Sequence, residues 1–212
     1  MKTNSSETLI QQGLGFFSIV HSPSTVEKLS IYMQELDRWN RRVNLTAKRP
    51  VEWVIRELLY DAFFLSSVIK DVRVAVDIGS GNGILALTLA IIDETMQMFS
   101  VDKSLRKIQF QRHIKRSLKL PNLSLIQGRI ESLEPLCVDA LLSKGFGSSS
   151  LILKTGGKHL NEGGAAYLLK GLTERAGAFP GFHLETARHY RLPENPKEYQ
   201  LFVYRKMAGG SN

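Results

Sequence analysis

The chain has 212 residues, of which 43% are hydrophobic, and its 28 lysines and arginines outnumber its 20 aspartates and glutamates, for a formal charge of +8. This composition excludes a disordered polyelectrolyte and predicts one main domain with a small extension. The single cysteine, Cys137, is too few for an intramolecular disulfide or an iron–sulfur cluster, and the longest apolar run, residues 84–92, is too short to span a membrane. We therefore expect a cytoplasmic protein whose surplus positive charge suits a nucleic acid or an anionic membrane surface.

Residues 1–70 are predicted to form a helical extension. Ser24 and Glu27 make a capping-box pattern at the start of one helix, and apolar residues follow at helical spacing. A second helix is expected after Pro50, because proline suits the first turn of a helix. Its apolar face carries Val54, Ile55, Leu58, Ala62 and Leu65.

Beyond residue 70 the apolar pattern changes to that of an α/β sheet. Residues 72–78 predict a strand, a glycine cluster ends it, and a helix reaches residue 92. Further strands are predicted at residues 98–101, 123–127, 138–142 and 166–169, with helices at 103–119 and 146–160. Such alternation predicts a parallel sheet covered on both faces. Residues 182–192 and 199–205 flank a turn-rich segment and predict an antiparallel hairpin at one edge. This domain covers residues 71–206, and residues 207–212 are expected to be a flexible tail.

The glycine loop after the first strand is the most informative segment. Gly79, Gly81 and Gly83 alternate at the carboxyl end of the strand, where open α/β sheets bind ligands. Both dinucleotide dehydrogenases and S-adenosylmethionine enzymes use such a loop. Asp77 would be unfavourable beside a diphosphate but favourable near the ammonium of a methionine moiety, so the charge favours S-adenosylmethionine as the cofactor.

Two later segments complete the predicted cofactor site. Asp102 ends the next strand, about twenty residues beyond the first glycine, where a carboxylate can bind both ribose hydroxyls of an adenosine. Residues 128–131 follow the third strand and could place main-chain amides and the Glu131 carboxylate against the adenine. Each segment has an alternative role, because an acid also stabilises the start of a helix: Asp102 before Ser104, and Glu131 in a first turn.

Basic residues cluster in two places. The predicted helix at 103–119 contains seven lysines and arginines and, after Asp102, no acid, which suits either a solvated face or a polyanion. A second cluster surrounds Trp39 and Asn40, and we expect it to contact RNA. Its predicted RNA-binding residues are Arg41, Arg42, Lys48 and Arg49. A membrane helix is disfavoured because the aromatic residues and leucines are needed for the core.

No residue is predicted to act as a general base or a metal ligand. The five histidines show no metal-ligand spacing, no serine elbow or P-loop occurs, and Cys137 is expected to be a small buried residue. An acceptor atom with a free lone pair and no proton can be methylated without a general base. The sequence therefore favours catalysis by positioning.

Several segments together resemble the RsmG (GidB) family, in order over residues 24–206. They are residues 39–47 (WNRRVNLTA), 56–61, 77–83 (DIGSGNG), 128–131 (GRIE) and 143–146 (SKGF). The first is specific to the family, whereas the glycine loop is common to class I methyltransferases. The resemblance implies a Rossmann-like class I S-adenosylmethionine-dependent methyltransferase fold. It also implies a bacterial cytoplasmic enzyme that methylates N7 of a guanine in small-subunit (16S) ribosomal RNA, free or in its ribonucleoprotein particle.

By position, the resemblance implies that Gly79, Ile84, Ile130, Glu131 and Lys144 contact the cofactor, with Asp102 on its ribose. The chain departs from the family pattern at four places. Ile84-Leu85-Ala86 stands for a Phe-or-Leu, Pro, Gly run, and Lys144 stands for an arginine, which loses a planar two-pronged donor. Glu57 stands for a histidine and Tyr199-Gln200 for an Arg-His pair. We assign Lys144 to the cofactor carboxylate or an RNA phosphate.

Two other functions are compatible with the same residues. One is a nucleotide-dependent oxidoreductase of Rossmann type, because the glycine loop also fits that class. The other is a ribosome-binding protein that keeps the methyltransferase fold without the chemistry. Thermal shift with S-adenosylmethionine against NAD(H) and NADP(H) distinguishes the oxidoreductase from a methyltransferase. Methyl incorporation into ribosomal RNA distinguishes the ribosome-binding protein.

Overall fold

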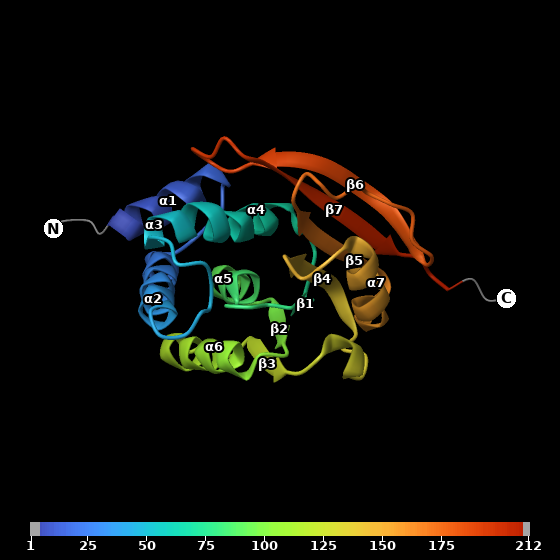
Figure 1. The fold of residues 1–212 in the computed structure, drawn as a ribbon, viewed down its shortest axis with the longest axis horizontal. Coiled ribbons are helices and arrows are strands. Elements are labelled where there is room, and N and C mark those ends of the chain that lie inside the picture. The colour runs from blue at the N-terminus through green and yellow to red at the C-terminus, as the bar shows by residue number, and fades with distance from the viewer. Residues whose placement is uncertain (1–4, 210–212) are drawn as a thin grey trace.

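A computed structural model describes residues 5–209 of the chain (Figure 1). Its helices and helical turns are α1 (Ser5–Phe16), α2 (Pro23–Asn40), α3 (Val51–Val54), the π-helical turn η1 (Ile55–Leu59), α4 (Tyr60–Val68), α5 (Ile84–Ile92), α6 (Leu105–Leu118), the 3₁₀ turn η2 (Ile130–Ser132), α7 (Ser149–Gly156) and the 3₁₀ turn η3 (Gly157–His159). Its strands are β1 (Val74–Ile78), β2 (Gln97–Asp102), β3 (Leu123–Gln127), β4 (Val138–Lys144), β5 (Leu160–Lys170), β6 (Phe182–Arg191) and β7 (Glu198–Lys206).

The strands form one seven-stranded sheet in the order β3-β2-β1-β4-β5-β7-β6. Strands β1 to β5 run parallel, and β7 pairs antiparallel with both β5 and β6. The prediction of a mostly parallel sheet with an antiparallel C-terminal hairpin is confirmed. β5 is longer than predicted, because it begins at Leu160, directly after the 3₁₀ turn η3 that follows α7.

Helices cover both faces of the sheet, as predicted for a parallel sheet. Alternate residues of β1 point to opposite faces, so Ala75 joins the core beneath α1 to α6 and Val76 joins the core beneath α7. Figure 1 shows α2, α5 and α6 on one side of the sheet and α7 on the other. Every residue of α5 from Ile84 to Ile91 is buried, because the helix lies between the sheet and the N-terminal helices. The division of the chain at residue 70 stays a prediction.

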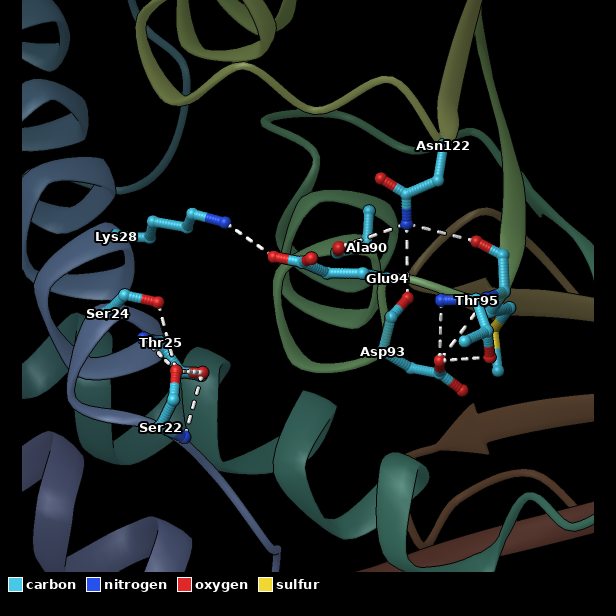
Figure 2. Close-up of polar contacts among 10 residues, drawn as sticks. Ser22, Ser24, Thr25, Lys28, Ala90, Asp93, Glu94, Thr95 and Asn122 are labelled. Atoms are coloured by element: carbon cyan, nitrogen blue, oxygen red, sulfur yellow. Dashed lines mark hydrogen bonds and ion pairs between the residues drawn. The ribbon is translucent and has the colours of Figure 1, made fainter.

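Helix α2 begins earlier than predicted, and its cap uses different residues. Ser22 is the N-cap: its Oγ accepts from the main-chain N–H of Thr25 at 3.2 Å, and Thr25 Oγ1 accepts from Ser22 N–H at 3.3 Å (Figure 2). The capping box predicted for Ser24 and Glu27 is therefore wrong. Pro23 has no N–H to satisfy and takes the first helical position, which moves the start of the helix two residues back.

Polar contacts fix the far end of α5, at the amino edge of the sheet. Asn122 Nδ2 donates to the carbonyls of Ala90, Asp93 and Met96, each at 3.1 Å, and Figure 2 shows this amide inside the turn between α5 and β2. Lys28 of α2 pairs with Glu94 at 2.7 Å. These contacts hold α5 in place, so the glycine loop at its opposite end is attached to a rigid helix.

The predicted helix after Pro50 is confirmed, but it contains the π-helical turn η1. A π turn holds an extra residue and rotates the residues that follow it around the helix axis. After the turn the buried face includes Tyr60, Phe63 and the carboxylate of Asp61, which is 0% exposed. A buried carboxylate in an otherwise apolar segment needs partners, and they are described below.

Two predictions about single segments have different outcomes. The prediction that Cys137 is buried is wrong: the residue is exposed, with a φ of +52°, in the turn that leads into β4. Its neighbour Val138 enters the sheet instead.

In the predicted tail, residues 207–209 have no regular structure, and residues 210–212 lie outside the described residues, as do residues 1–4 of the extension. Among the described residues, no helix combines the length and apolar character of a membrane span.

Candidate functional site

The carboxyl ends of the parallel strands meet where the strand order reverses. From β1 the chain continues to β2 and β3 on one side, and later to β4 and β5 on the other, so β1 and β4 border the crevice where open α/β sheets bind ligands. A pocket of about 320 Å³ lies there. A larger hollow, of about 750 Å³, lies at the amino ends of β4 and β5, the edge that these sheets do not use for ligands.

The pocket is lined by residues that follow four neighbouring strands. They include Gly79 after β1, Asp102 at the end of β2, Gly128 and Ile130 after β3, and Gly145 and Phe146 after β4. Each of these strands therefore contributes its carboxyl end to one cavity. The predicted cofactor site required that the carboxyl ends of these strands lie around one cavity.

The glycine loop has the backbone conformation that its sequence predicts. Gly79, Gly81 and Gly83 have φ values of +65°, +62° and +83°, in the left-handed region that side chains disfavour. At Gly83 a β carbon would also lie 2.7 Å from Leu87 Cδ1. The loop can therefore bring bare main chain close to a ligand.

Gln111, on α6, holds the loop in place. Its Nε2 donates to the Gly81 carbonyl at 2.9 Å and to Ser80 Oγ at 3.0 Å, while its Oε1 accepts from Ser100 Oγ at 2.6 Å. Sequence reasoning missed this residue. The available signal was a polar side chain within the apolar stripe of the helix, and Gln111 is fully buried.

Asp102 is fixed by two main-chain donors. Its Oδ2 accepts from Gly81 N–H at 2.9 Å and its Oδ1 accepts from Ser104 N–H at 2.8 Å. The bond to Ser104 is the helix-start contact of the alternative role, and the bond to Gly81 ties the carboxylate to the glycine loop. Each oxygen keeps a second lone pair, so the carboxylate can also accept bonds from ligand hydroxyls.

Asp77 lies buried beneath the same loop. Its Oδ2 accepts from Ala86 N–H in the first turn of α5, at 3.3 Å. Burial, with a smaller contribution from the Asp102 charge, raises the pKa of Asp77 to about 7. Near neutral pH this carboxyl is divided between its two forms, and a nearby cation would favour the carboxylate.

The segment after β3 is held from beneath by a histidine. His159 Nδ1 accepts from Leu136 N–H at 3.2 Å, which assigns the ring proton to Nε2, and Nε2 lies 3.0 Å from the Ile130 carbonyl. Burial lowers the pKa of His159, in keeping with a neutral ring. Glu131 is half-exposed, in the 3₁₀ turn η2, and pairs with Arg129 at 3.6 Å. Its predicted alternative role, at a helix start, is thus also compatible.

Lys144, at the end of β4, lies against a carboxylate of the protein. Its Nζ is 3.3 Å from Asp61 Oδ2, and Tyr190 donates its hydroxyl to Asp61 Oδ1 at 2.7 Å. Burial raises the pKa of Asp61, and the lysine charge acts against that rise. The buried Asp61 carboxylate, which follows the π turn, therefore has the Lys144 ammonium and the Tyr190 hydroxyl as partners.

Two of the residues at which the chain departs from the family pattern, Glu57 and Tyr199, contact each other. Tyr199 donates its hydroxyl to Glu57 Oε2 at 2.6 Å, and Asn195 Nδ2 donates to Glu57 Oε1 at 2.7 Å. Burial and the bond to Glu57 raise the pKa of Tyr199, so its hydroxyl keeps the proton that it donates. Gln200 Nε2 donates to the Gly171 carbonyl at 2.7 Å. Glu57, Asn195 and Tyr199 therefore form one hydrogen-bonded cluster, whereas Gln200 bonds to the main chain.

The basic cluster near Trp39 is exposed. Arg41 pairs with Asp37 at 2.7 Å, and the Arg49 guanidinium lies 5.7 Å from the centre of the Trp53 ring. Asn40, by contrast, has a structural role, because its Oδ1 accepts from the main chain of Leu45 and Thr46. On the predicted helix at 103–119, the lysines and arginines make no ion pair with a carboxylate of residues 5–209.

The structure brings together only part of the predicted cofactor site. The pocket is lined by Gly79, Asp102, Ile130 and Glu131. Lying in or next to the glycine loop are Asp77, Gly81, Gly83 and Ile84. Of the predicted cofactor residues, Lys144 lies outside the pocket lining. The predicted RNA-binding residues also lie outside it: Arg41, Arg42, Lys48 and Arg49. No role in the site was predicted for Phe146, although it lines the pocket. Within residues 5–209 no three histidine, cysteine, aspartate or glutamate side chains form a cluster that could hold a metal ion.

Solved structures of methyltransferases have a similar fold. TrmN from Thermus thermophilus superimposes with a TM-score of 0.53 at 20% identity, covering 79% of this chain and 53% of that chain. TrmK from M. capricolum, in complex with S-adenosyl-homocysteine, superimposes with a TM-score of 0.53 at 15% identity, covering 70% and 67%. At these identities the similarity concerns the fold, which is that of class I methyltransferases.

Sequence comparisons are more specific. Ribosomal RNA small subunit methyltransferase G of Bordetella avium is 32% identical over 194 residues, covering 86% of both chains. The protein of the same name in Pseudomonas syringae pv. syringae is 34% identical over 194 residues, covering 88% of this chain and 89% of the relative. The family model described as rRNA small subunit methyltransferase G matches residues 25–178. With this match and these two relatives, the chain belongs to the rRNA small subunit methyltransferase G (GidB) family.

Proposed function

We propose that this protein is a cytoplasmic enzyme that transfers a methyl group from S-adenosylmethionine to N7 of a guanine in small-subunit ribosomal RNA. The observation that carries the proposal is the Asp102 carboxylate, held by the amides of Gly81 and Ser104 in the wall of the pocket, in a chain of this family. A fixed acceptor beside a glycine loop is suited to the ribose of an adenosine.

The residues of the pocket fit the parts of this cofactor. Asp102 would accept hydrogen bonds from the ribose hydroxyls, and Gly128 to Glu131 would lie against the adenine. The loop leaves room at Gly81, where a side chain would stand, whereas the Phe146 ring covers Gly79. Buried Asp77 lies beneath the loop, suited to the ammonium of the methionine part. We propose Gly83 and Ile84 as the support of this loop. Lys144 would reach the cofactor carboxylate only by leaving Asp61.

The proposed chemistry needs alignment more than proton transfer. The cofactor supplies a methyl group on a sulfonium. Guanine N7 offers a free lone pair in the major groove and has no proton to lose. The protein therefore has to hold the two atoms in line at about 3–3.5 Å and to exclude water. This requirement agrees with a site in which no residue has been assigned as a general base.

The expected product is 7-methylguanosine, and no single side chain will behave as a general base. The measurement is single-turnover methyl transfer to 16S ribosomal RNA and to assembled subunits, at saturating cofactor and over a range of pH. Borohydride and aniline cleavage locates the modified nucleotide. A methyl group on an exocyclic amine or a ribose would contradict the mechanism. So would a log-linear rise of rate with pH that one carboxylate or histidine variant abolishes.

RNA affinity is expected to fall steeply with salt, and the basic cluster near Trp39 to contribute to that slope. Replacing Arg41 and Arg42 with glutamine should lower the log–log slope by about 0.7–0.9 for each phosphate that the variant no longer neutralises. The matched control replaces Lys70 and Arg73 with glutamine. Both residues are exposed and precede β1, so they lie at the amino edge of the sheet. Filter binding over a salt series measures both. An unchanged slope in the first variant would show that these arginines are only solvated.

A further inference from the structure

The Phe146 ring rests on the glycine loop. A β carbon built on Gly79 would lie 2.2 Å from Phe146 Cδ2, so the ring contacts main chain that only a glycine leaves open. The ring is half-buried and lines the pocket. Asp102 ends β2 and Phe146 follows β4, so these residues lie on opposite sides of β1. Phe146 is therefore on the side of the pocket away from the proposed ribose position.

The main chain around Phe146 is held firmly. Gly147 has a φ of +157°, and its carbonyl accepts a hydrogen bond from buried Lys170. Ser149 N–H donates to Glu174 Oε1 at 2.6 Å, and Lys170 pairs with Glu174 at 3.1 Å. Burial would raise the pKa of Glu174, but its bonds to Ser149 and Lys170 outweigh that effect and lower it. The end of β5 thus positions a loop that carries a half-exposed aromatic ring.

We propose that the Phe146 ring is the surface on which the acceptor guanine stacks during methyl transfer. The proposal rests on the proposed function. If Asp102 holds the ribose and Asp77 the ammonium, the sulfonium lies near Gly79, and N7 must approach to about 3–3.5 Å. A nucleobase placed there meets the ring beside Gly79. Base stacking on an aromatic side chain is a common mode of single-stranded RNA recognition.

The aromatic face of Phe146 and the pairing of Lys144 with Asp61 suit the product of the reaction. Methylation of N7 makes the guanine ring cationic, and an aromatic face attracts a cation within about 6 Å. Lys144 is two residues away and would repel that charge, but it is paired with Asp61 at 3.3 Å. The Asp61 carboxylate therefore offsets the lysine next to the proposed acceptor position.

The test compares Phe146→Ala, Phe146→Leu and Phe146→Tyr in the full-length protein with 16S ribosomal RNA. We expect Phe146→Ala to lower kcat/KM for RNA by about 5- to 150-fold, the range typical for removal of one base-stacking ring, while the Kd for S-adenosylmethionine stays within about twofold. Phe146→Tyr should keep most activity because it keeps the ring. Phe146→Leu should stay impaired, because leucine restores volume but not a planar face.

A control variant separates stacking from packing. Phe179 is a half-buried aromatic residue of the same hydrophobic cluster, packs against Tyr204 and does not line the pocket. Phe179→Ala should leave kcat/KM for RNA close to that of the parent protein. Equal activity of Phe146→Leu and the parent, or an equal loss of cofactor affinity in Phe146→Ala, would overturn the inference. Failure of the parent protein to form 7-methylguanosine would instead overturn the proposed function.

Discussion

Replacing Asp102 with alanine is expected to weaken S-adenosylmethionine binding by about a hundredfold or more. Two charge-assisted hydrogen bonds to ribose hydroxyls contribute about 1.5–3 kcal/mol each, and about 1.4 kcal/mol corresponds to a tenfold change in Kd. The variant also loses the bond that Asp102 accepts from Gly81 N–H at 2.9 Å, which orders the glycine loop. Calorimetric titration with the cofactor measures the change.

Asp139 provides a matched control for this prediction. Its Oδ2 also accepts from two main-chain donors, Arg73 N–H at 3.1 Å and Val74 N–H at 3.0 Å, but at the amino edge of the sheet. Asp139→Ala should therefore lower the thermal midpoint of the protein without the cofactor while leaving cofactor affinity within about twofold. An unchanged Kd in Asp102→Ala would remove this carboxylate from the site.

Cofactor affinity is expected to rise with pH up to about neutrality, because of Asp77. Burial raises the pKa of Asp77 to about 7, and an ammonium beneath the loop would bind the ionised form. Binding should therefore weaken about fiftyfold between pH 7 and pH 5, and by about tenfold for each further pH unit. Asp77→Asn keeps an acceptor for Ala86 N–H but cannot titrate, so its affinity should be lower and independent of pH in this range.

The stability of the protein without cofactor should depend on pH in the opposite sense. The folded-state pKa of Asp77, about 7, lies above its value of 3.8 in an unfolded chain, so folding favours the protonated form. This contribution is fully present below pH 4 and is lost as pH rises through about 7, by an amount on the order of 4 kcal/mol. Thermal melts of the parent protein and Asp77→Asn at about pH 5 and pH 8 measure most of this loss. If the difference between the two proteins is the same at both pH values, Asp77 does not titrate in this range.

The sequence by itself determined the order of the elements and the centre of the site. Hydrophobic period, glycines and prolines are local signals, so the alternation of strands and helices and the C-terminal hairpin followed from them. Gly79 and Asp102 each come at the carboxyl end of a strand, and parallel strands bring such ends to one edge. Their proximity was therefore predictable without knowledge of any packing detail.

Local signals were less reliable where two of them competed. The capping pattern at Ser24 did not set the start of the helix. Pro23 takes the first helical position instead, because proline has no N–H that needs a partner. The apolar neighbours of Cys137 predicted burial, but the left-handed turn before β4 exposes its side chain. The π turn η1 could not be predicted from local signals. It changes which residues face the core, but it does not change the apolar pattern of the sequence.

Only the tertiary structure decided which polar side chains become partners. Lys144 meets Asp61, Tyr199 meets Glu57, and Phe146 lies over Gly79, although each pair is far apart in the sequence. Such contacts depend on how strands β4 and β7 pack against the helix of residues 51–68 and the glycine loop. A buried carboxylate selects whichever donor the packing places beside it, because an unpaired charge is costly in the interior. That selection is made in three dimensions, and no local pattern encodes it.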